Sequence, residues 1–108
     1  MNVELAPAIQ RYVKASNQHD MESILACFSD DALIHDEGET LQGKKAIESW
    51  IVKTIEKYKF QFKPLGVKDE EPEVVVAIEV SGTFRASPVT LDYHFKIGND
   101  RIDSLAID

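Results

Sequence analysis

The stretch "KKAIESWIVKTIEKYKFQF" (residues 44–62) contains the point at which the hydrophobic pattern of the chain changes its period. Up to Tyr58 the apolar residues recur at helical spacing, and from residue 59 onward they alternate with polar residues, as in a strand. The pattern predicts a helix over residues 44–58, with an apolar stripe made of Ala46, Ile47, Trp50, Ile51, Ile55 and Tyr58. The change of period separates a helix-rich first part of the chain from a strand-rich second part.

Two further helices are expected upstream of this point. Residues 3–18 carry an apolar stripe at helical spacing, and Pro7 is compatible with a helix because it falls in the first turn. Asp20 offers a side-chain oxygen that would cap a second, short helix, and His19 before it is expected to be solvated in the turn. The two apolar stripes are Leu5, Ile9, Tyr12, Val13 and Ser16 in the first helix, and Met21, Ile24, Leu25 and Phe28 in the second.

A polar cluster follows a short apolar run in "DDALIHDEGET" (residues 30–40). Residues 31–36 are expected to form a strand, and its alternation places Ile34 with Asp36 on one face and His35 on the other. Gly38 then indicates a turn, to which Glu37 and Glu39 are also assigned.

Four strands are expected after residue 59, because their apolar residues alternate and turn signals separate them. The turn signals are "DEEPE" (69–73), "RASP" (85–88) and "GND" (98–100), and Gly82 is a candidate bulge in a long strand. Helices gathered early and strands gathered late predict an α+β fold, in which a curved antiparallel sheet carries three helices on one face.

Length and charge limit the classes of function. The 108 residues fit a single domain spanning residues 1–108. The net charge of −7 is unlike that of a nucleic-acid binder, which usually carries an excess of basic residues. No stretch of the sequence approaches the ~18 consecutive apolar residues of a membrane span. The single cysteine, Cys27, reads as a small buried apolar residue, so we expect a cytoplasmic protein that binds neither nucleic acid nor membrane.

Val74, Val75 and Val76 follow one another without alternation, so both faces of that strand are partly apolar. A sheet with helices on only one face leaves the other face uncovered. We therefore expect a homodimer through the outer sheet face, and a monomeric mass by light scattering would contradict it.

Four segments, in this order and at this length, resemble one family. They are "RYVKASNQHDMESI" (11–24), "FSDDALIHDEG" (28–38), "GKKAIESW" (43–50) and "HFKIGNDRIDSLAI" (94–107). The chain resembles the nuclear transport factor 2-like superfamily, in the branch of the ketosteroid isomerases and the SnoaL-like polyketide cyclases. The resemblance implies a cone-shaped, cystatin-like fold: a strongly bent antiparallel sheet closed by three helices around an apolar pocket.

The resemblance also implies roles for single residues. Tyr12 matches the tyrosine that donates a hydrogen bond to the enolate oxygen in the isomerases, and Asp36 matches their proton-shuttling base. The isomerases carry a protonated aspartate where this chain has Tyr93, which could act as a second donor; Asp92 points to the opposite face and cannot replace it. The isomerases also tend to have proline after the base, where this chain has Glu37. The residues expected to line the pocket are Trp50, Ile34, Phe95 and Phe28.

The sequence is compatible with two functions. The first is a cofactor-independent isomerase or cyclase that moves a proton on a small apolar carbonyl compound, with Asp36 as the base and Tyr12, aided by Tyr93, stabilising the oxyanion. The second is a ligand-binding or dimerisation module without catalysis, in which Tyr12 is a packed aromatic and Asp36 caps local backbone amides. No cofactor is indicated by a motif, and a metal site is not expected because His35 and Asp36 project to opposite faces.

Overall fold

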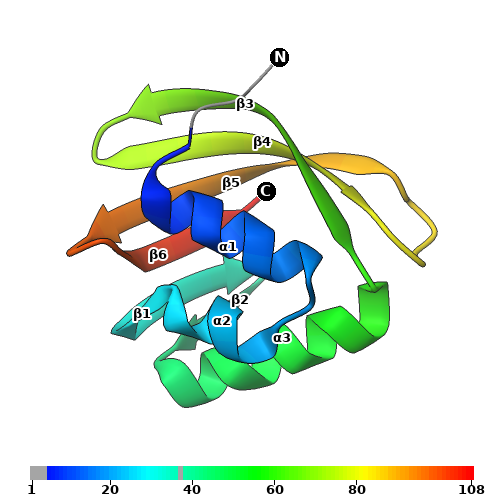
Figure 1. Ribbon diagram of the computed structural model, residues 1–108, viewed down its shortest axis with the longest axis horizontal. Coiled ribbons are helices and arrows are strands. Elements are labelled where there is room, and N and C mark those ends of the chain that lie inside the picture. Colours follow the sequence, from blue (N-terminus) through cyan, green and yellow to red (C-terminus); the bar gives the residue numbers. More distant parts are fainter. Residues whose placement is uncertain (1–4, 37) are drawn as a thin grey trace.

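The computed structural model describes residues 5–36 and 38–108. These residues form three helices and a curved six-stranded sheet, which confirms the expected α+β class (Figure 1). The expected helix start at residue 3 and the assignment of Glu37 to a turn lie outside the described residues.

The three helices are α1 (Pro7–Asn17), α2 (Met21–Ala26) and α3 (Lys44–Tyr58). Pro7 stands in the first turn of α1, as expected. Asp20 caps α2, because its carboxylate accepts hydrogen bonds from the backbone N–H of Ser23 at 3.3 Å and from the Ser23 hydroxyl at 2.7 Å. The predicted bounds of the third helix are confirmed, and it ends at Lys59 in the left-handed conformation.

The strands are β1 (Phe28–Asp36), β2 (Glu39–Gln42), β3 (Gln61–Glu70), β4 (Glu73–Ser81), β5 (Val89–Gly98) and β6 (Arg101–Ile107), in the sheet order β2-β1-β6-β5-β4-β3. Neighbouring strands are antiparallel except for β1 and β6, which pair in parallel. The late group of four strands is confirmed. Strand β2 was not expected, because its four residues "ETLQ" have little apolar alternation and are ordered by pairing with β1. The assignment of Glu39 to the turn is therefore wrong, since Glu39 is the first residue of β2 and pairs with Asp36.

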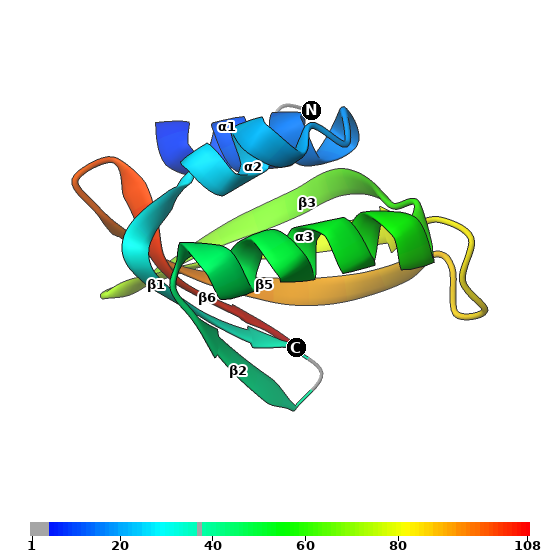
Figure 2. The same cartoon turned by 90° about the horizontal axis from the view of Figure 1, so that it is seen from below.

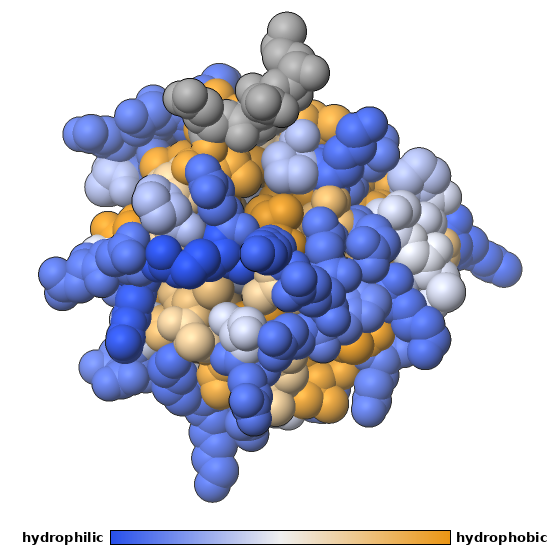
Figure 3. Space-filling view, in the orientation of Figure 1, coloured by the Kyte–Doolittle hydropathy of each residue, from blue (hydrophilic) through white to orange (hydrophobic). Residues whose placement is uncertain are grey.

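The helices lie on one face of the sheet and cover different parts of it. Helix α1 contacts β3 and β6, whereas α3 contacts β1 and β2, and α2 connects the two helices (Figure 2). Hydrophilic residues cover most of the face shown in Figure 3, and hydrophobic ones show between them. The candidate functional site lies between α1, α3 and the sheet.

The sheet bends where its pairing register shifts. One shift lies between Pro64 and Gly66 in the β3–β4 pair, and others lie between Lys96 and Ile97 and between Phe28 and Leu33. The bulge predicted at Gly82 is wrong, because β4 ends at Ser81 and Gly82 lies in the following loop. Glycine is needed there for a different reason: a Cβ atom would collide with the carbonyl oxygen of Tyr58.

The end of α1 and the turn after it are hydrogen-bonded to the chain at the start of β3. The Asn17 side chain donates to the carbonyl oxygen of Phe62 at 3.0 Å and accepts from its backbone N–H at 2.6 Å. His19 Nε2 lies 2.6 Å from the carbonyl oxygen of Phe60, so the expectation that His19 is solvated is wrong. These bonds fix the backbone of two aromatic residues that face the helices.

Replacing Asn17 tests this connection. Asn17→Ala leaves the N–H and the carbonyl of Phe62 without their side-chain partner, so we expect the free energy of unfolding to fall by about 2 kcal/mol. The measurement is urea denaturation, with Gln18→Ala as a control because that neighbouring side chain is exposed. A loss for Asn17→Ala no larger than that of the control would contradict this role.

Among the described helices, none combines the length and the apolar character that crossing a membrane requires. On the sheet face away from the helices, Val75 pairs with His94 and is 8% exposed. The homodimer expected through this face stays a prediction.

Candidate functional site

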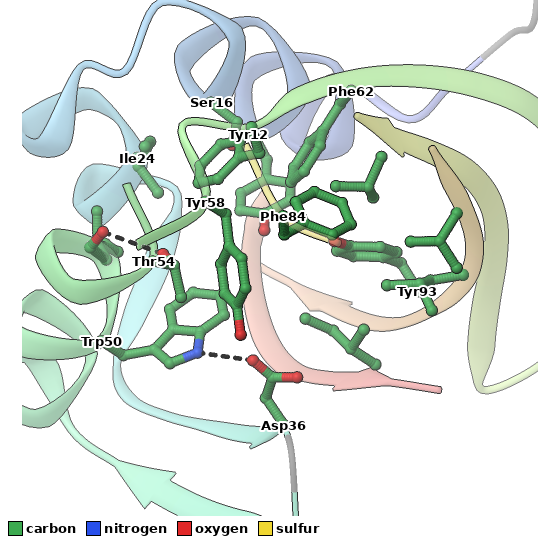
Figure 4. Close-up of a pocket in the computed structure, with 16 residues that line it drawn as sticks. Tyr12, Ser16, Ile24, Asp36, Trp50, Thr54, Tyr58, Phe62, Phe84 and Tyr93 are labelled. Carbon is green, nitrogen blue, oxygen red and sulfur yellow. Dashed lines mark hydrogen bonds between the residues drawn. The ribbon is translucent and has the colours of Figure 1, made fainter. Parts of the chain in front are cut away.

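A cavity of about 250 Å³ lies between α1, α3 and the sheet (Figure 4). Its lining is mainly aromatic and aliphatic, which is typical of a small-molecule pocket. The sixteen lining residues are Tyr12, Ser16, Ile24, Asp36, Trp50, Ile51, Thr54, Tyr58, Phe60, Phe62, Val80, Phe84, Val89, Leu91, Tyr93 and Ile107.

The lining residues divide into a buried floor and a partly exposed rim. The floor consists of Tyr12, Ser16, Ile24, Ile51, Phe60, Phe62, Val80 and Tyr93. The rim consists of Asp36, Trp50, Thr54, Tyr58, Phe84, Val89, Leu91 and Ile107. Two of the three candidate catalytic residues, Tyr12 and Tyr93, are therefore deep in the cavity, and the third, Asp36, stands near solvent.

Asp36 reaches the cavity because it is the last residue of β1 and shares the inward face with Ile34, as the alternation predicted. Its Oδ2 accepts a hydrogen bond from the indole Nε1–H of Trp50 at 3.0 Å. The Tyr58 hydroxyl also points toward this carboxylate (Figure 4). Both aromatic residues come from α3, so the strand supplies the carboxylate and the helix supplies the groups around it.

Tyr12 on α1 and Tyr93 on β5 are held by neighbouring aromatic rings. The ring centroid of Tyr12 lies 5.8 Å from that of Phe28 and 5.7 Å from that of Phe95, both in edge-to-face contact. Phe62 lies between the two tyrosines, with centroids 6.0 Å from Tyr12 and 5.5 Å from Tyr93. Both rings are therefore fixed in orientation by packing.

Burial keeps both phenols protonated. Desolvation raises the pKa of Tyr12 well above its ordinary value; the neighbouring Tyr93 and, more weakly, Asp36 raise it further, while the hydrogen bond with Ser16 lowers it. The pKa of Tyr93 is raised by burial first and by the Asp36 charge second. Both hydroxyls can therefore donate hydrogen bonds at neutral pH, and both feel the charge of the same carboxylate.

These shifts predict how stability changes at high pH. Above about pH 10 the unfolded chain loses its phenol protons while the folded chain keeps them on Tyr12 and Tyr93, so the folded state is destabilised as pH rises. We expect the free energy of unfolding to decline between pH 9.5 and 11.5, and to decline less steeply in Tyr93→Phe. The measurement is urea denaturation at several pH values. Equal slopes for the wild type and the variant would contradict the shift.

Three residues expected to line the pocket lie elsewhere. Phe28, Ile34 and Phe95 are fully buried in the core and are not among the lining residues, so that prediction is wrong for them. The inward faces of Ile34 and Phe95 were correctly predicted, but both residues lie one layer deeper than the cavity lining. Phe28 was expected in the second helix, and it is instead the first residue of β1, because α2 ends at Ala26. Phe28 and Phe95 pack against the Tyr12 ring. Trp50 does line the cavity.

Other polar residues of β1 and β5 do not line the cavity. His35 is exposed and pairs with the Thr40 hydroxyl at 2.9 Å, and Asp92 is exposed on β5. His94 contacts Asp108 and Glu73, and it does not line the cavity. Within residues 5–36 and 38–108, no group of histidine, cysteine and acidic side chains is arranged to hold a metal ion.

Sequence reasoning missed part of the rim. Thr54 and Tyr58 follow Trp50 at intervals of four residues on α3, so all three share one helix face. That spacing was available as a signal, although Tyr58 was assigned only to the core stripe. Phe84 continues the alternation of Val74, Val76, Ile78 and Val80 in the sequence, but it lies in the loop after β4. Its ring makes an edge contact with Tyr58 at 5.5 Å.

Residues 9–103 match the family model of the SnoaL-like domain. The chain belongs to this family. The resemblance to the nuclear transport factor 2-like superfamily is thereby confirmed. A search of curated proteins found no match to this SnoaL-like chain.

Solved structures agree with this assignment. A candidate polyketide cyclase from Sinorhizobium meliloti is 34% identical, with a TM-score of 0.91 over 96% of this chain and 95% of that one. A candidate ketosteroid isomerase from Kribbella flavida has the same fold at 10% identity, with a TM-score of 0.80 over 94% of this chain and 74% of that one. A computationally designed 17-OHP binder is 18% identical, with a TM-score of 0.81 over 96% of this SnoaL-like chain and 94% of the designed one.

Proposed function

We propose that this protein is a cofactor-independent enzyme that transfers a proton on a small apolar carbonyl compound, as an isomerase or an aldol-type cyclase. The observation that carries the proposal is the arrangement of one cavity: a carboxylate at the rim and two protonated phenols on the buried floor. A base near a carbon and hydrogen-bond donors near the carbonyl oxygen are what enolisation requires. The names of the related cyclase and isomerase structures are consistent with it.

The proposed reaction begins with the carbonyl oxygen near Tyr12 and Tyr93 and the adjacent C–H bond near Asp36. Asp36 takes the proton, and the electrons of the C–H bond form an enolate whose negative charge lies on oxygen. The two phenols stabilise that charge by hydrogen bonds, which strengthen as the charge develops. Protonated Asp36 then returns its proton to a different carbon in an isomerase. In a cyclase the enolate carbon attacks a second carbonyl of the same molecule, and the proton neutralises the resulting alkoxide.

Trp50 has a positioning role in this reaction. Its indole N–H holds one carboxylate oxygen of Asp36 by a 3.0 Å hydrogen bond, which orients the carboxylate and stabilises its ionised form.

Removing this donor should change the pH dependence as well as the rate. For Trp50→Phe we expect the rate to fall about tenfold, because the Asp36 carboxylate loses the hydrogen bond that orients it toward the substrate. We also expect the acid limb of the pH–rate profile to move to higher pH, since the carboxylate anion has lost a donor. The control is Ser49→Ala, an exposed change on the same helix. A slower variant with an unchanged pH profile would show that Trp50 only fills space.

The proposal is tested by exchange of α-protons for deuterium. Neutral ketones of one or two rings, such as 3-cyclohexenone, 1-indanone and 2-tetralone, are incubated with the protein in D₂O, and the loss of their α-proton signals is followed by NMR. The assay detects enolisation whatever the final product is. The proposal is supported if the wild type accelerates α-proton exchange and Asp36→Asn does not. It is contradicted if the wild type binds ketones in the cavity and accelerates the exchange of none of them.

The second candidate function is a ligand-binding module without catalysis. It is favoured by one observation: the position of the protonated aspartate of the isomerases holds Tyr93 in this chain, which is a weaker donor. The designed 17-OHP binder is an example of this fold used for binding. Ketones that bind without exchanging their α-protons would favour this second function.

A further inference from the structure

The charge inside the cavity has one sign. Of the sixteen lining residues, Asp36 is the one with a formal charge at neutral pH, and none is lysine, arginine or histidine. The charge reaches across the cavity, because Asp36 is among the causes that raise the pKa of both Tyr12 and Tyr93 on the floor. A ligand in the cavity therefore experiences a negative potential from rim to floor.

The aromatic walls reinforce this preference. Trp50, Tyr58 and Phe84 stand at the rim with Asp36, and Phe60, Phe62 and Tyr93 form part of the floor. The faces of aromatic rings carry partial negative charge, so they attract ammonium groups and repel anions. Tyr58 already shows this attraction, because the ammonium of Lys57, which does not line the cavity, lies 5.0 Å from its ring centroid.

The volume of the cavity limits the size of the ligand. About 250 Å³ is slightly below the usual range for small-molecule pockets, which is roughly 300–1,000 Å³. A skeleton of one or two rings is compatible with this volume and with the flat aromatic side chains of the floor.

We propose that the cavity selects ligands by charge and takes compact ammonium compounds of one or two rings. The ammonium group lies beside Asp36 at the rim, and the rings lie on the aromatic floor. Neutral compounds of the same shape bind more weakly, and carboxylates, phosphates and sulfates are rejected. The inference rests on the same cavity as the proposed function but does not require catalysis, and an amine held in this way would compete with a ketone substrate.

Three ligands with one skeleton test the inference: 2-aminotetralin, 2-tetralone and tetralin-2-carboxylate. Their dissociation constants for the wild type are measured at pH 7 by titration calorimetry or by ligand-observed NMR. We expect the amine to bind at least tenfold more tightly than the ketone, and the carboxylate at least tenfold more weakly. Three constants within a factor of three, or a carboxylate that binds best, would overturn the inference. This ranking needs no variant, so it does not depend on a mutant that folds.

Two variants with the same change of charge locate the effect. In Asp36→Asn the amine and the ketone should bind within a factor of three of each other, whereas Asp92→Asn, on the exposed side of β5, should keep the wild-type ratio. If the ratio of the ketone and amine dissociation constants were the same in the two variants, the preference would come from the overall negative charge of the protein. That result would overturn the assignment to Asp36.

The proton-transfer function and the selection of ligands by charge can fail separately in these experiments. Charge ranking without α-proton exchange would leave this inference standing and contradict the proposed function. Exchange of α-protons without a ranking of ligands by charge would support the proposed function and contradict this inference.

Discussion

Asp36→Asn is expected to slow α-proton exchange of a bound ketone by a factor of about 10²–10⁴, the usual contribution of a positioned general base. Asparagine has the shape of aspartate, and its side-chain oxygen can still accept the Trp50 N–H. It lacks the basic oxygen that removes the proton. The loss should therefore appear in kcat, with KM changed much less.

The matched control is Asp31→Asn, an exposed aspartate on the same strand β1. It removes the same charge from the same element without touching the cavity, so exchange should stay within twofold of the wild type. If folded Asp36→Asn kept more than half of the wild-type exchange rate, Asp36 would not be the base.

Tyr12→Phe is expected to lower kcat by about 10²–10³, the effect of removing one oxyanion donor. The aromatic ring stays in place against Phe28 and Phe95, so the cavity keeps its shape and the ketone still binds. The change removes one hydroxyl from the buried floor, where water does not readily replace it. The measurement is the exchange rate at saturating ketone.

Tyr93→Phe is the comparison for this prediction. Because both phenols are proposed to donate to one oxygen, the double variant should be slower than either single variant, and Tyr12→Phe should be the slower of the two singles. A Tyr12→Phe protein with an unchanged kcat would favour the packed aromatic role that the sequence left open.

The parts of the fold that local patterns determine were predictable from the sequence. The helix over residues 44–58 follows from its apolar stripe, and the Asp20 cap follows from the chemistry of helix N-termini. Strand β2 and the side-chain partner of His19 were not predictable, because both depend on segments brought together only by folding: β2 pairs with β1, and His19 meets Phe60, 41 residues away. The parallel pairing of β1 with β6 is likewise set by tertiary structure.

The candidate site was predicted in part for a related reason. Alternation along β1 and β5 correctly placed Asp36 and Tyr93 on the inner face of the sheet. It could not distinguish a residue at the cavity from one in the layer below, so Ile34 and Phe95 were assigned to the lining although they are fully buried in the core. Depth depends on which side chain of a helix lies opposite, and the sequence of one strand does not contain that information.

The orientation of a bound ketone shows whether Tyr12 and Asp36 can act on it together. In a crystal structure of the protein with 2-tetralone, we expect the carbonyl oxygen within about 3 Å of the Tyr12 hydroxyl, and the adjacent carbon beside Asp36, within reach of proton transfer. The proposed roles of Asp36 as the base and Tyr12 as the oxyanion donor would be contradicted by a ketone that bound outside the cavity. They would also be contradicted by a ketone whose carbonyl pointed toward Trp50 and whose rings lay on the floor.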